Sequence, residues 1–82
     1  MNPSVVAAEP LENYKLKVHF DNGEVKEFDV APFLDKGIFV ELKDKGYFSK
    51  VSVAFGAIQW PNEQDFSNDT VYLLGVDVQS AA

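Results

Sequence analysis

Catalytic chemistry in this chain would depend on very few side chains, and His19 is the first candidate because it is the single histidine. A serine or threonine nucleophile needs a general base such as histidine, and the chain has no cysteine to serve as a thiolate nucleophile or a zinc ligand. The alternation of residues 14–20 places His19 on the polar face of a strand, beside Lys17. We therefore expect an exposed strand histidine and no catalytic residue, so the chain is predicted not to be an enzyme.

A second candidate is the run of polar residues near the C-terminal helix. Asp65, Ser67 and Asp69 have the i, i+2, i+4 spacing that opens a calcium-binding loop. An EF-hand loop also needs Gly at its sixth position and Glu at its twelfth, where this chain has Thr70 and Val76. Ser67 suits instead the N-cap of a helix, with Asp69 in the first turn, where an acid stabilises the helix dipole. We expect helix capping, and neither a metal nor another cofactor.

The segment Trp60-Pro61-Asn62 is the most individual element of the chain. Trp60 either packs in the core, with Pro61 ending a strand, or lines the rim of an interface, because Trp is enriched at binding hot spots. Glu63 and Asp65 could form a carboxylate pair for acid–base work, but the sequence predicts no cleft around them, so a solvated turn is favoured. The candidate interaction surface consists of Trp60, Asn62, Glu63, Asp65 and Asp69.

These side chains must be positioned by strands, and residues 14–20 give the strongest strand signal because apolar and polar residues alternate at every step. Asp21-Asn22-Gly23 predicts a turn, and residues 24–30 the returning strand. A two-residue loop would pair apolar with charged side chains. A three-residue loop with a glycine bulge pairs apolar with apolar side chains and positive with negative ones. We therefore expect Leu16 opposite Phe28, Tyr14 opposite Val30, Lys17 opposite Glu27 and Lys15 opposite Asp29.

A second hairpin is predicted from the alternation of residues 51–55. Gly56-Ala57 suits a two-residue turn with Gly first, which would oppose Phe55 to Ile58 and Val53 to Trp60. Residues 4–9 are a candidate N-terminal strand.

The remaining segments predict short helices. Residues 31–35 suit one helical turn, residues 38–42 are an apolar run of ambiguous type, residues 44–46 suit a turn, and a helix begins after Ser67 and ends at Gly75. We expect an α+β fold with a small antiparallel sheet of two hairpins and two or three short helices. Residues 1–82 would form one domain with a core over about 5–75, and residues 76–82 would be a terminal strand or a tail.

The order of landmarks in residues 5–73 resembles the small bacterial domain-of-unknown-function family 2442. The landmarks are Phe20-Asp21-Asn22-Gly23-Glu24, Phe28-Asp29-Val30, Phe39 with Leu42, Phe48 with Val51, Ile58-Gln59-Trp60-Pro61-Asn62, Asp65 and Val71-Tyr72. Family members commonly have Gly where this chain has Glu63. The resemblance implies an α+β fold with an antiparallel sheet and gives no catalytic residue. Similar domains occur alone, fused to a helix-turn-helix domain, or beside a small protein in an arrangement like a toxin–antitoxin pair.

The distribution of charge along the chain limits the kinds of partner that it can bind. The net charge is −6, and all seven lysines lie in residues 14–50, whereas residues 51–82 hold four acids and no lysine. The chain has no arginine, so autonomous nucleic-acid binding is not expected. No apolar run is long enough to span a membrane, and residues 1–10 lack the basic start of a secretory signal, so we expect a cytoplasmic protein.

The small size points to association with another protein. An 82-residue chain without a disulfide gains only marginal stability from its own core. We expect a non-enzymatic protein-interaction module that binds a protein partner or itself. The alternative is an antitoxin-like or regulatory partner of a neighbouring small protein.

Overall fold

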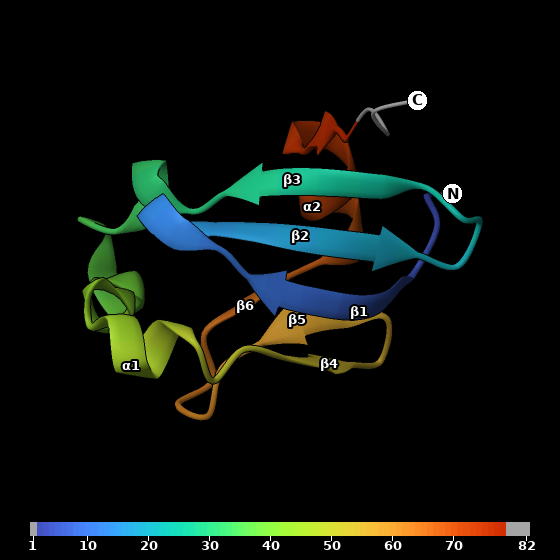
Figure 1. The fold of residues 1–82 in the computed structure, drawn as a ribbon. Coiled ribbons are helices and arrows are strands. Elements are labelled where there is room, and N and C mark those ends of the chain that lie inside the picture. The colour runs from blue at the N-terminus through green and yellow to red at the C-terminus, as the bar shows by residue number, and fades with distance from the viewer. Residues whose placement is uncertain (1, 79–82) are drawn as a thin grey trace.

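Two antiparallel sheets form the framework of the computed structural model, which describes residues 2–78. The larger sheet has the strand order β1-β2-β3-β7, and the smaller one has the order β4-β5-β6 (Figure 1). The larger sheet is made of β1 (Val5–Pro10), β2 (Lys15–Phe20), β3 (Val25–Asp29) and β7 (Val76–Asp77). The smaller sheet is made of β4 (Ser52–Ala54), β5 (Ala57–Gln59) and β6 (Asp65–Phe66). The two predicted hairpins thus belong to two different sheets.

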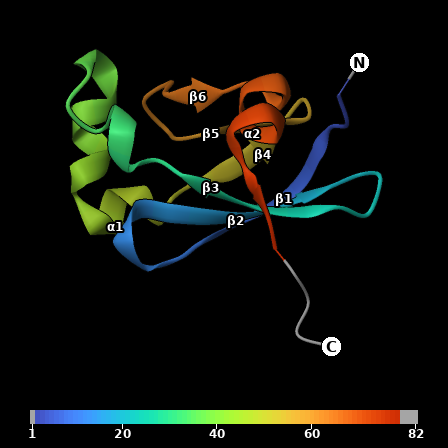
Figure 2. The same ribbon diagram turned by 90° about the horizontal axis from the view of Figure 1, so that it is seen from above.

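Short helical segments connect the strands, and together with the sheets they confirm the α+β class. Three are 3-10 segments and two are α-helices: η1 (Glu12–Tyr14), η2 (Ala31–Phe33), η3 (Gly37–Lys43), α1 (Lys45–Phe48) and α2 (Asn68–Leu74). Seen from above, the smaller sheet and α2 form a second layer over the larger sheet, and α1 with its neighbouring turns closes one end (Figure 2).

The core lies between these layers and is rich in aromatic rings. Strand β2 explains why, because its alternating residues Leu16, Val18 and Phe20 are buried while the residues between them are only partly covered. The buried apolar set is completed by Val5, Phe28, Val30, Leu34, Leu42, Phe48, Ile58, Trp60, Phe66 and Val71.

The first hairpin has the predicted register. Leu16 lies opposite Phe28, and Lys17 lies opposite Glu27. The loop has three residues, and Gly23 adopts a φ of 89°, the left-handed conformation that a glycine supplies without steric cost. The edge strand β1 pairs with β2, so the candidate N-terminal strand is confirmed.

The second hairpin is shifted by two residues from the predicted register. Val53 lies opposite Ile58 and Ala54 opposite Ala57, so the turn is Phe55-Gly56 rather than Gly56-Ala57. Both turn residues have positive φ, 53° and 76°, as a type I′ turn requires. The amide of Val5 donates to the carbonyl of Gly56 at 2.8 Å and so ties the turn to β1. A shift of two residues keeps every side chain on its face, so the apolar pattern could not detect it.

The structure defines the conformation of three segments that the sequence predicted only in outline. Residues 44–46, predicted as a turn, begin α1, because the Asp44 carboxylate accepts a hydrogen bond from the Gly46 amide at 2.9 Å and caps the helix. The ambiguous run 38–42 is part of η3. Of residues 76–82, Val76 and Asp77 form a strand paired with β3, and residues 79–82 lie outside the described part of the chain.

Candidate interaction site

Trp60, the first member of the predicted interaction surface, is a core residue. It is 2% exposed, and its indole Nε1 donates to the backbone carbonyl of Phe48 at 2.8 Å. Its ring centroid lies 5.9 Å from that of Phe48 and 6.1 Å from that of Phe66. The core interpretation of Trp60 is therefore confirmed, and the side chain supports the loop that follows rather than presenting itself to a partner.

Behind that loop, Gln64 is a buried polar side chain that no sequence pattern indicated. It is 2% exposed, and its Oε1 accepts a hydrogen bond from the Tyr47 hydroxyl at 2.7 Å. Its Nε2 donates to the carbonyl of Ile38 at 3.0 Å and to the Glu41 carboxylate at 2.9 Å. All three partners come from η3 and α1, so Gln64 fastens the loop to these segments.

Asn62 belongs to the same network. Its backbone amide donates to the Tyr47 hydroxyl at 2.7 Å, and its side-chain Nδ2 donates to the other oxygen of the Glu41 carboxylate, also at 2.7 Å. The Asn62 side chain is thus engaged within the molecule. Glu63 and Asp65 are exposed to solvent. Glu63, the fourth residue of the loop that starts at Trp60, has a φ of 71° and takes no part in this network.

Asp69 is held by a different part of the chain. Ser67 caps α2, because its hydroxyl accepts a hydrogen bond from the Thr70 amide at 3.2 Å, which confirms the capping interpretation. Asp69, in the first turn, accepts a hydrogen bond from Asn2 Nδ2 at 3.0 Å. Hydrogen bonds therefore place Asn62 beside η3 and α1 and Asp69 beside the N-terminal segment. Of the five predicted residues, Trp60 is thus buried, and Asn62 and Asp69 are hydrogen-bonded within the chain.

The N-terminal segment also meets the tip of the second hairpin, where the sequence predicted no site. Ser4 exchanges hydrogen bonds with Asp21, its amide donating to the carboxylate at 3.3 Å and its carbonyl accepting from the Asp21 amide at 2.9 Å. A Cβ on Gly56 would lie 2.9 Å from the Ser4 hydroxyl, so the hairpin tip and the N-terminal segment are in close contact. We call the surface formed by Ser4, Asp21, Phe55 and Asp69 the acidic end.

Phe55 projects from the acidic end into solvent. Its relative exposure is 105%, and it adopts a φ of 53°, a conformation that is rare for a bulky side chain. The sequence pattern did not predict Phe55 as an exposed turn residue, because the alternation of residues 51–55 placed it in a strand. The adjacent glycine was the available signal, since a type I′ turn prefers residues that tolerate positive φ, with glycine second.

The comparisons with known proteins agree with the fold. A protein-family model described as "Protein of unknown function (DUF2442)" matches residues 5–76. The chain belongs to the DUF2442 family. The predicted resemblance is therefore confirmed, and it covers both hairpins, the Trp60 loop and α2. No curated protein and no solved structure matches the chain. The DUF2442 description states no activity, so a functional argument has to start from the geometry.

His19 of this DUF2442 domain has a structural partner. Its Nε2 donates to the Glu9 carboxylate at 2.7 Å across β1 and β2, and a third of its side chain is exposed. In residues 2–78, no three histidine, aspartate or glutamate side chains gather as metal ligands. No helix in the same range is long and apolar enough to cross a membrane.

The His19–Glu9 hydrogen bond predicts a measurable titration. It holds the pKa of the Glu9 carboxyl below its ordinary value, because the bond favours the ionised form. A depressed carboxyl pKa contributes stability above the ordinary value, and this contribution is lost as the pH falls through the depressed one. In His19→Ala, the Glu9 midpoint followed by carboxyl carbon NMR is expected to rise toward the ordinary value, while the nearby Lys17 charge still lowers it. An unchanged midpoint would show that His19 is not the cause.

Proposed function

We propose that this DUF2442 domain is a non-enzymatic protein-interaction module whose contact surface is the acidic end. The proposal rests on one observation, the fully exposed Phe55 at positive φ. The backbone conformation costs stability, and the exposed ring contributes none. A left-handed backbone costs a bulky residue roughly 1–2 kcal/mol, and full burial of a Phe side chain would gain about 1.5–3 kcal/mol. A protein partner that covers the ring would recover the second amount.

The surroundings of Phe55 indicate the chemistry of that partner. Asp21 and Asp69 are exposed and hydrogen-bonded to the N-terminal segment that contacts the hairpin tip, while Lys43 and Lys45 lie in η3 and α1 at the opposite end of the molecule (Figure 1). An aromatic side chain flanked by carboxylates suits an apolar pocket rimmed by lysine or arginine. The partner is therefore a protein with a basic surface, and salt should weaken the complex.

The variant Phe55→Asn tests this function and carries a stability prediction. Asn-Gly is the preferred pair for a type I′ turn, and no buried area is lost at a fully exposed position. We expect the free energy of unfolding to rise by about 0.5–1 kcal/mol in urea titrations. A fall in stability would show that Phe55 packs within its own chain.

The binding experiment uses affinity capture from the native host at physiological salt. The tagged wild-type chain is compared with Phe55→Asn and with Val40→Asn, which replaces another exposed apolar residue in η3 at the opposite end. We expect the wild type and Val40→Asn to retain the same partner and Phe55→Asn to lose it. If Phe55→Asn retains that partner, or if the wild type captures none, the proposal fails.

The same acidic end suits a second candidate, an antitoxin-like regulator that covers a basic site on a neighbouring protein. The favouring observation is that Asp21 and Asp69 are exposed and both hydrogen-bonded to the N-terminal segment, which contacts the turn that carries the exposed Phe55. Expression of the neighbouring protein alone and with this chain distinguishes the two functions. Growth inhibition that this chain relieves supports the regulator, whereas a harmless neighbour excludes it.

A further inference from the structure

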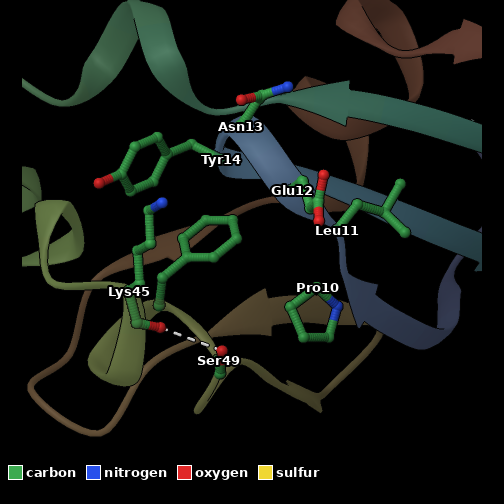
Figure 3. A pocket seen from close by; sticks show the side chains of 8 residues that line it. Pro10, Leu11, Glu12, Asn13, Tyr14, Lys45 and Ser49 are labelled. Atoms are coloured by element: carbon green, nitrogen blue, oxygen red, sulfur yellow. Dashed lines mark hydrogen bonds between the residues drawn. The ribbon is translucent and has the colours of Figure 1, made fainter.

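A groove of about 700 Å³ lies between η1 and α1 (Figure 3), at the end of the molecule opposite the β4–β5 turn (Figure 1). Its volume falls in the range of about 300–1,000 Å³ that small-molecule sites occupy. Polar and apolar atoms line the groove in about equal parts, and the apolar part is provided by Pro10, Leu11, Tyr14 and Phe48. Two charged side chains also line the groove, Glu12 from η1 and Lys45 from α1.

The aromatic wall of this groove is held in place by an aromatic contact and a hydrogen bond. The Tyr14 ring meets the Phe48 ring edge to face, with centroids 5.5 Å apart, and the Tyr14 hydroxyl donates to the carbonyl of Lys43. Asn13 and Tyr14 both have a φ of 61°, so two successive residues other than glycine adopt the left-handed conformation there. Backbone strain of this kind costs roughly 1–3 kcal/mol per residue and persists only where the surroundings enforce it.

Lys45 supplies a positive charge that is in no ion pair within the described part of the chain. Its side chain extends along the groove toward Tyr14 (Figure 3). The ion pairs found within residues 2–78 engage Lys15, His19, Lys26 and Lys43, and none includes Lys45. An ammonium group beside an apolar wall is complementary to a ligand that has an apolar body and an anionic end.

We propose that this groove binds a small aryl or alkyl monocarboxylate. The apolar body lies against Pro10, Leu11 and Phe48, and the carboxylate pairs with Lys45. Glu12 is repulsive to a second negative charge, so the site selects a monoanion over a dianion. The site is independent of the proposed protein-interaction function, because Phe55 lies at the other end of the molecule.

The test is an NMR titration of the full-length ¹⁵N-labelled chain with 3-phenylpropionate, with 3-phenylpropanamide as the uncharged isostere. We expect saturable shifts of amides in residues 11–14 and 45–49. The carboxylate should bind about two- to fivefold more tightly than the amide, the range of a solvent-exposed ion pair. Lys45→Met should remove this preference, Glu12→Gln should increase it, and Lys50→Met, outside the groove lining, should leave it unchanged.

Several results would overturn the proposal. They are the absence of saturable shifts, equal binding of the acid and the amide by the wild type, and a preference that survives in Lys45→Met. Should Lys45→Met lose the folded spectrum, Lys45→Gln provides the same comparison with a polar side chain. Shifts of the groove amides on dilution of the unliganded chain would place a second copy there instead, and phenylpropionate binding would then be rejected.

Discussion

Replacing Trp60 with Ala is expected to lower the free energy of unfolding by about 3–5 kcal/mol, the usual cost of removing a large buried aromatic side chain. The change leaves a cavity between Phe48 and Phe66 and removes the shorter of two hydrogen bonds to the Phe48 carbonyl, which also accepts from the Val51 amide at 3.3 Å. A domain of this size has a total stability of only about 4–12 kcal/mol at the usual 0.05–0.15 kcal/mol per residue. The substitution therefore removes a large part of the total stability.

Circular dichroism during urea unfolding is the suitable measurement, because Trp60 is the single tryptophan and its fluorescence disappears with the substitution. Trp60→Phe provides the matched control. It keeps an aromatic ring between Phe48 and Phe66 but removes the Nε1 hydrogen bond, so its loss should be smaller, about 1–3 kcal/mol. A loss of less than about 1 kcal/mol for Trp60→Ala would contradict the core position of the side chain.

The two hairpins show how far the sequence could predict the sheets. In the first, Lys15, Lys17, Glu27 and Asp29 add charge pairs to the apolar pattern, and a Gly23 bulge completes a single consistent register. In the second, residues 51–58 contain no charged side chain, so two registers that differ by two residues place the same side chains in the core. In the observed register, the Gly56 carbonyl in the turn accepts a hydrogen bond from the Val5 amide of β1, a contact that the sequence pattern of the hairpin does not contain.

The candidate site was predicted less completely, for a related reason. Local pattern identified Ser67 as a cap and Asp69 as exposed, because both depend on neighbours within one helical turn. Gln64 could not be identified in this way. Its partners Ile38, Glu41 and Tyr47 precede it by 26, 23 and 17 residues, and only the packing of η3 and α1 brings them together. A glutamine in an acidic loop is otherwise typical of a solvated turn.

Gln64→Glu is the substitution that should expose this network most clearly. The introduced carboxylate places an oxygen where Nε2 donated to the Ile38 carbonyl and to the Glu41 carboxylate, so two donated hydrogen bonds become repulsive contacts. The new charge is also nearly excluded from water, because Gln64 is 2% exposed. We expect a loss of about 3–5 kcal/mol at pH 7, the cost of an uncompensated buried charge.

The pH dependence of that loss identifies its cause. Burial and the nearby Glu41 raise the pKa of the introduced carboxyl in the folded state, since both disfavour its ionised form. The penalty is therefore small below the unfolded pKa and grows as the pH rises toward the folded one. Gln64→Met removes the same hydrogen bonds without adding a charge, so its difference from the wild type should vary little between pH 4 and pH 8. If urea unfolding gives parallel pH profiles for the two variants, the Gln64 side chain does not face Glu41 in the folded protein.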